Sequence, residues 1–148
     1  MESSAKSPAL TMRILKYAFV VCAFLFVQVA IEIPVRPHQP VSQPIEIGIT
    51  IVALACIAVG FLVPRFVFRA PESTYQGNPA LTPLKRWMTK GIMSLAYFEA
   101  CILFGLLLHY LGARLWLVEF LFGAGIAAEL FWSPGTPPSE AQGNLSQD

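Results

Sequence analysis

The length of its apolar segments is the feature that most constrains how this chain can fold. The segment from Tyr17 to Ile31 is interrupted only by Gln28, and the segment from Ile47 to Val63 contains no charged residue. A helix that crosses a bilayer needs about 20 mostly apolar residues. Four segments reach this length, and they predict an all-α, polytopic membrane protein with spans at about residues 12–33, 45–68, 87–111 and 114–132.

The composition agrees with a membrane protein and excludes several other classes. Hydrophobic residues make up 55% of the chain and charged residues only 13%, whereas an ordinary soluble domain is about 25% charged. The net charge of +1 provides no basic face for nucleic acid. The three cysteines lie inside apolar segments without a second metal-ligating residue nearby, so neither a disulfide framework nor a zinc site is expected.

The connections between the apolar segments predict how the spans are joined. Residues 111–113 leave room only for a tight turn, so the last two spans should form a helical hairpin. We therefore predict four transmembrane helices arranged as two antiparallel hairpins. Residues 1–11 and 133–148 are polar or rich in Pro, Gly and Ser, and we expect both segments to be disordered.

The distribution of basic residues predicts the orientation. Four spans place both termini and the middle connection on one side of the membrane. Only Arg36 and Arg114 lie on the other side, and the remaining basic residues are Lys6, Arg13, Lys16, Arg65, Arg69, Lys85, Arg86 and Lys90. Because connecting segments rich in Lys and Arg stay in the cytoplasm, we expect a multi-pass protein of the cell inner membrane with both termini cytoplasmic.

Small residues four positions apart predict where the helices pack. Lipid provides no hydrophobic drive for helix association, so close backbone approach through small side chains matters. The third span offers Ala96 with Ala100, followed by Gly105, and the fourth span offers Gly123 with Ala127. We expect these five residues at helix–helix contacts.

Glu99 is the acidic residue nearest the centre of a predicted span. It lies about 12 Å along the helix from the inner end of the apolar segment. An isolated charge at this depth is costly, so its carboxyl group is expected to be protonated or paired. Three roles remain open: proton or cation binding during transport, a hydrogen bond from the protonated acid to a neighbouring helix, or docking to a positive group of a partner subunit.

Other polar residues lie nearer the two faces of the membrane. His109, Arg114 and Glu119 gather at the outer end of the last two spans, where a His–Glu pair, an Arg–Glu pair and separate solvation are the alternatives. Glu129 lies near the inner end, about 15 Å along the helix from Glu119. We expect Glu129 to pair with a basic residue at the start of the third span, either Arg86 or Lys90.

Catalytic motifs are missing from the sequence. The chain has no HExxH, GxSxG or phosphate-binding loop, and it has no pair of facing histidines for haem. A proton relay through Glu99, His109 and Glu129 would need bridging waters, because Glu99 and His109 lie about 15 Å apart along one helix. We therefore expect no enzyme activity, no catalytic residue, no metal and no cofactor.

Two motifs resemble known membrane proteins. A Pro64-Arg65 pair closes the first hairpin and an Ala96-x-x-Glu99-x5-Gly105 helix opens the second, over about residues 12–134. This layout resembles small uncharacterised four-span bacterial membrane proteins, whose activity is not assigned. The stretch 96–105 is also similar to the carboxylate helix of ATP synthase proteolipid subunits, which would imply that Glu99 is an ion-binding carboxylate.

The chain departs from the families that would imply transport. The glycine-repeat helix and the polar Arg-Gln-Pro loop of the proteolipids are missing. Small multidrug transporters also have four helices and one key Glu, but theirs lies in the first helix, where the apolar part of this chain's first span has none. Both families remain comparisons for the role of Glu99.

The sequence thus predicts a non-enzymatic subunit or accessory factor of a membrane assembly. The alternative is a small proton- or cation-coupled transporter or proteolipid that uses Glu99, and a membrane enzyme or quinone-binding protein comes third. The expected partners are the lipid bilayer and either a second copy of the chain or other membrane subunits, and no nucleic acid.

Overall fold

The computed structural model describes residues 8–33, 41–66 and 83–136, which form four helices and no strand. The helices are α1 (Pro8–Glu32), α2 (Gln43–Phe66), α3 (Pro83–Tyr110) and α4 (Leu115–Phe131). The predicted all-α class is confirmed for this part of the chain. Residues 8–11, which we expected in a disordered segment, instead form the start of α1, while residues 1–7 and 137–148 lie outside the described ranges.

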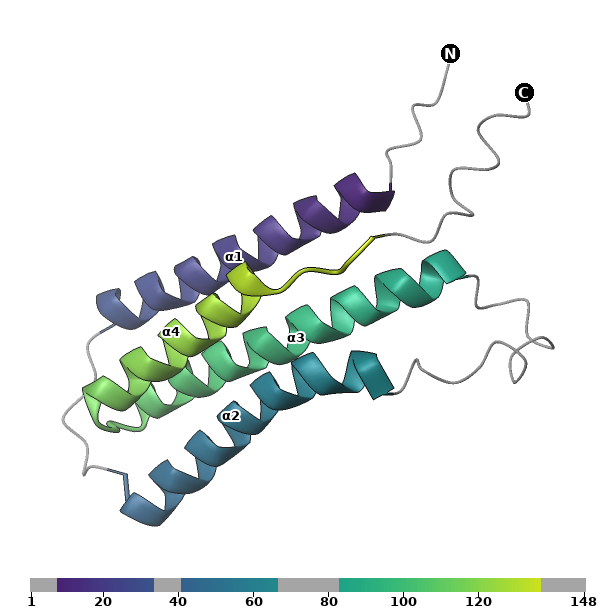
Figure 1. Ribbon diagram of the computed structural model, residues 1–148. Coiled ribbons are helices and arrows are strands. Elements are labelled where there is room, and N and C mark those ends of the chain that lie inside the picture. Colours follow the sequence, from purple (N-terminus) through teal and green to yellow (C-terminus); the bar gives the residue numbers. More distant parts are fainter. Residues whose placement is uncertain (1–7, 34–40, 67–82, 137–148) are drawn as a thin grey trace, which may run out of the picture.

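The turn between α3 and α4 follows from one glycine. Gly112 has a φ of 73°, a left-handed conformation that glycine adopts without steric cost. The Gly112 N–H donates to the His109 carbonyl at 3.0 Å, and the Ala113 N–H donates to the Leu108 carbonyl at 3.0 Å. These two bonds cap the last carbonyls of α3. The chain reverses within this turn, and α4 runs back along α3 (Figure 1).

The α3–α4 pair forms the centre of the bundle. In Figure 1, α1 lies on one side of this pair and α2 on the other, and α1 and α2 have no contact with each other among the described residues. The predicted arrangement as two antiparallel hairpins therefore stays a prediction for α1 and α2, whose described residues do not contact each other. Both pack on the central pair, where glycines allow close approach: Gly60 of α2 lies against Phe98, and Gly91 of α3 lies against Met12.

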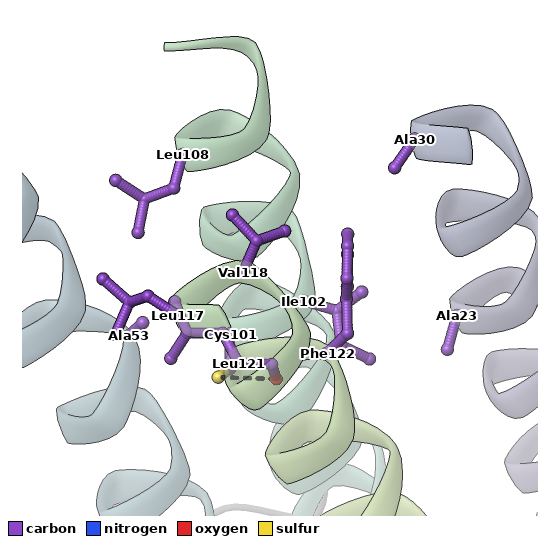
Figure 2. Close-up of a cluster of buried hydrophobic side chains, with 10 residues drawn as sticks. All are labelled: Ala23, Ala30, Ala53, Cys101, Ile102, Leu108, Leu117, Val118, Leu121 and Phe122. Carbon is purple, nitrogen blue, oxygen red and sulfur yellow. Dashed lines mark hydrogen bonds between the residues drawn. The ribbon is translucent and has the colours of Figure 1, made fainter. Parts of the chain in front are cut away.

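Two clusters of buried side chains hold the bundle together. The first, shown in Figure 2, joins α3 and α4 through residues such as Cys101, Ile102 and Phe122, with alanines of α1 and α2 at its edges. Within it, the Cys101 thiol faces the Leu121 carbonyl at 3.7 Å. The second cluster lies nearer the chain termini and consists of Met12, Trp87, Leu95, Phe98, Ala128 and Trp132.

The outer surface of the bundle is apolar. Side chains such as Phe24, Leu25 and Ile51 are more than half exposed, which would be costly in water but costs nothing against lipid tails. Three helices are long and apolar enough to cross a membrane: Pro8–Glu32, Gln43–Leu62 and Leu84–Tyr110. These helices support assignment as a membrane protein. With 17 residues, α4 is shorter than these three helices.

Candidate functional site

Two carboxyl groups, Glu99 on α3 and Glu129 on α4, lie next to each other in the interior of the bundle. The Glu129 side chain is completely buried, and Glu99 is partly buried. The two carboxyl groups are close enough for their charges to act on each other. The sequence analysis singled out both residues separately, and the structure brings them together.

Close packing between α3 and α4 brings Glu99 and Glu129 near each other. At Gly125 the absent side chain leaves space for Ile102, and a Cβ there would lie 3.3 Å from the Phe98 backbone oxygen. At Gly105 a Cβ would lie 3.3 Å from the Leu121 Cβ. Because glycine lets the two backbones approach, long side chains one helical turn apart can reach each other across the interface.

The carboxyl pair has almost no polar surroundings. No N–H or O–H group of the described residues donates a hydrogen bond to Oε2 of Glu99 or to either carboxyl oxygen of Glu129, so the polar group that each acid meets is the other acid. Buried polar atoms are nearly always hydrogen-bonded, so three such oxygens in one place call for an explanation such as an exchangeable proton or ion. This lack of donors distinguishes the pair from an ordinary structural network.

Lys16 of α1 is a positive group that acts on Glu129. Its ammonium group donates hydrogen bonds to the carbonyls of Leu130 at 2.8 Å and Trp132 at 2.7 Å, at the C-terminal end of α4. Its charge also acts on Glu129. We expected Glu129 to pair with Arg86 or Lys90, but its carboxyl oxygens make no hydrogen bond with either one.

For the three groups Glu99, Glu129 and Lys16 of the described residues, one proton on the two acids brings the summed charge to zero. Two ionised carboxylates beside one lysine leave a net charge of −1 in an apolar interior, where an uncompensated charge is costly. One proton on the pair reduces its charge to −1, which Lys16 neutralises. Two facing carboxyl groups that share one proton are also the arrangement that like-charge repulsion favours.

At the opposite end of the bundle, the alternatives for His109, Arg114 and Glu119 were a His–Glu pair, an Arg–Glu pair and separate solvation. Arg114 pairs with Glu46 of α2, with 3.1 Å between Nη2 and Oε2. The Arg114 backbone N–H also donates to Glu46 Oε1 at 3.0 Å. Glu119 is exposed and takes no part in this pair. His109 stacks edge-on against Tyr110, and its Nε2 is buried without a hydrogen-bond partner in the described ranges.

Sequence reasoning missed Glu46, although one signal was present. Glu46 is the acidic residue in the first turn of α2, and Arg36 and Arg114 were the only basic residues expected on that side. A charge-pairing argument could therefore have connected Glu46 to Arg114. The contact joins residues 68 positions apart, so the sequence alone does not show that α2 and α4 begin side by side.

The small residues expected at helix contacts occupy different environments. Gly105 is buried in the α3–α4 interface, whereas Gly123 has no atom within 4 Å of the position that a Cβ would take. The close approach on α4 occurs two residues later, at Gly125. Ala96 is exposed, and Ala100 and Ala127 are half-buried.

Among residues 8–33, 41–66 and 83–136, no three His, Cys, Asp or Glu side chains gather as a metal site would require. The three cysteines are unpaired, and they range from exposed (Cys22) to buried (Cys101). Within the described residues, the structure instead brings together the two carboxyl groups, with Lys16 at the nearby end of α4.

Glu46 should stabilise the end of the bundle at which α4 begins. In Glu46→Ala, the N–H of Arg114 at the start of α4 loses its acceptor, and we expect a loss of about 1–3 kcal/mol. Because the Arg114 side chain is 55% exposed, most of this effect should come from the lost acceptor of the Arg114 backbone N–H. Faster amide hydrogen exchange in the first turn of α4 would show it. The exposed Glu119→Ala provides the control, and equal exchange in both variants would contradict the expectation.

Comparisons with protein-family models, with curated proteins and with solved structures found no match for this chain. The geometry of its own residues must therefore carry the functional argument. That geometry defines an all-α membrane bundle with a buried carboxyl pair.

Proposed function

We propose that the chain crosses the inner membrane four times, with both termini in the cytoplasm. The basic residues predict this orientation, and the antiparallel course of α4 along α3 supports a fourth crossing. At 17 residues, α4 is about 26 Å long, at the lower limit for a span. Trp132 and Arg114 flank it, and such residues anchor helix ends at the membrane surface.

The function that the geometry supports best is proton binding within the membrane, as part of a small proton-coupled transporter. The observation that carries this proposal is the Glu99–Glu129 pair, with three buried oxygens that receive no hydrogen bond from a described N–H or O–H group. Ionisable groups at membrane depth are expensive and mark ion pathways and proton relays. A proton that joins the pair lets one acid donate a hydrogen bond to the other, and its release leaves two facing charges.

The charge state of the pair supplies a driving force for conformational change. When the proton leaves, the like charges of Glu99 and Glu129 repel each other, and the positive charge of Lys16 partly offsets this repulsion at Glu129. Separation of α3 from α4, or entry of a cation, would relieve it. Either response links proton release to a change at the centre of the bundle, which is what coupled transport requires.

Flux in reconstituted liposomes tests this proposal. Purified full-length protein is reconstituted with a pH-sensitive dye in the lumen, and proton, sodium and potassium gradients are imposed in turn. We expect luminal pH changes faster than in empty liposomes, and loss of this excess in Glu99→Gln, which cannot release a proton. Glu119→Gln, an equivalent change at an exposed site of α4, should retain it. No excess flux in the wild type, or equal flux in Glu99→Gln, would refute the proposal.

The second candidate is a non-enzymatic subunit of a membrane assembly, and the observation that favours it is Glu119. This residue is exposed near the start of α4 and has no hydrogen bond or ion pair with a described residue. A carboxylate on the lipid-facing surface is better accommodated when a partner provides a polar group. Co-purification of a membrane protein that is lost in Glu119→Gln but kept in Glu99→Gln would support this role.

A further inference from the structure

A cavity at the end of the bundle that contains the first turns of α1 and α3 and the last turn of α4 is not explained by proton binding. It encloses about 360 Å³, which is within the usual size range of small-ligand sites. Residues of α1, Trp87 of α3 and the segment after α4 line it. Its full lining is Ala9, Arg13, Lys16, Tyr17, Trp87, Trp132, Ser133, Pro134, Gly135 and Thr136.

The charge of this cavity is positive. Arg13 and Lys16 lie one turn apart on the same face of α1, and no acidic residue is among the lining residues. The Arg13 side chain makes no hydrogen bond or ion pair with another residue in the described ranges. Lys16 gives two of its three N–H donors to the end of α4, which leaves one for a ligand. The two basic side chains therefore favour an anionic ligand in this cavity.

The polar groups between the two basic residues and α4 are positioned by specific contacts. The Trp87 indole N–H donates to the Pro134 carbonyl at 2.9 Å, which holds the segment after α4 against α3. Gly135, with a φ of 72°, turns this segment, and its N–H lies 3.5 Å from the Ser133 hydroxyl oxygen. Ser133 and Thr136 of this segment line the cavity together with Arg13, and hydroxyl groups are good donors to phosphate oxygens.

The aromatic residues indicate that the ligand is part of the membrane. Trp87 and Trp132 are both almost fully buried in the wall, while Tyr17 is 65% exposed on the outer surface of α1. Trp and Tyr rings concentrate at the depth of the lipid headgroups. The cavity therefore lies where phosphates of the bilayer are found and beside a surface that lipid tails would cover.

We infer that this cavity binds the phosphodiester headgroup of an anionic phospholipid, with Arg13 as its main contact and Lys16 as the second. The acyl chains would lie along the exposed apolar surface of α1. Basic pockets between helices on the cytoplasmic side of membrane proteins have this chemistry. The site is separate from the Glu99–Glu129 pair, although Lys16 is common to both.

Native mass spectrometry of the full-length protein tests the assignment directly. The protein, in a neutral detergent, is mixed with phosphatidylglycerol or phosphatidylcholine of identical acyl chains, and bound lipid is counted. We expect the wild type to retain phosphatidylglycerol preferentially. Arg13→Gln should lower this retention about fivefold, the effect of one basic residue at the membrane surface.

Matched variants separate a specific site from general charge. Arg65→Gln removes a basic residue of α2 that does not line the cavity, and it should retain the lipid as the wild type does. Arg13→Lys preserves the charge and should restore most of the preference, which also excludes misfolding as the cause. Equal loss in Arg13→Gln and Arg65→Gln would overturn the inference.

A competition experiment distinguishes a lipid headgroup from a soluble phosphate compound as the ligand. Inorganic phosphate alone lacks acyl chains, so it should not displace phosphatidylglycerol at equal concentration. Full displacement by inorganic phosphate would overturn the lipid assignment in favour of a soluble phosphate compound. No anion dependence in any arm would overturn the site altogether.

Discussion

Gly125→Leu should strongly destabilise the bundle. A Cβ at this position overlaps Ile102 and lies 3.3 Å from the backbone oxygen of Phe98, which cannot move aside as a flexible side chain can. A leucine adds three further carbons to this space. Overpacking of a tight core costs about 1–3 kcal/mol and occasionally more, so the α3–α4 interface should loosen and unfold at a lower temperature.

The matched control for this prediction lies two residues away on the same helix. At Gly123 no atom lies within 4 Å of the Cβ position. Gly123→Leu gains the same helix propensity, up to about 1 kcal/mol over glycine, without the steric overlap. Thermal unfolding followed by circular dichroism in detergent should therefore give a lower midpoint for Gly125→Leu and an unchanged or higher one for Gly123→Leu. Equal midpoints would show that the α3–α4 contact has been misplaced.

This pair of glycines also shows which part of the packing could be predicted from sequence. The apolar segments predicted four helices, because length and the absence of charge are properties of single segments. The facing side of α4 was not predictable, since a helix that is apolar all round carries little periodic signal for orientation. From the sequence alone, Gly123 and Gly125 are equally good candidates for a helix contact. The rotation of α4 about its own axis decides that Gly125 faces α3 and Gly123 does not.

For the candidate site too, one residue could be predicted from the sequence and its partner could not. The cost of a charge inside a span singled out Glu99 from the sequence alone. Its partner depends on where α4 turns back after Gly112 and on how closely the two helices approach at Gly105 and Gly125. Depth counted along separate helices placed Glu99 and Glu129 at different levels, whereas in the structure their carboxyl groups interact.

Lys16 could not be connected to this site by sequence reasoning either. We counted it among the cytoplasmic charges that set the orientation. In the structure its ammonium group reaches the carbonyls of Leu130 and Trp132, because α1 packs against the end of α4. The residue therefore has a structural contact at the membrane surface and an electrostatic one toward Glu129.

The double variant Glu99→Met/Glu129→Met should be more stable than the wild type while it loses proton-dependent flux. Methionine is unbranched and similar in length to glutamate, so it fills the same space without buried polar atoms. Replacement of buried ionisable groups by apolar residues of similar volume is often neutral or stabilising by about 1–4 kcal/mol. The three oxygens without a described donor make a gain in stability the expected result here.

This result would separate a functional pair from a structural one. If the pair held the bundle together through a hydrogen bond, the double Met variant would unfold at a lower temperature than the wild type. If the pair serves proton binding, the two buried acids destabilise the wild type. The double Met variant should then be more stable than the wild type and should show no proton-dependent flux. Thermal unfolding and liposome flux on the same protein preparation distinguish these outcomes. The single variant Glu99→Met serves as an internal check: it leaves Glu129 with Lys16 as its nearby opposite charge, so it should lose flux without reaching the stability of the double variant.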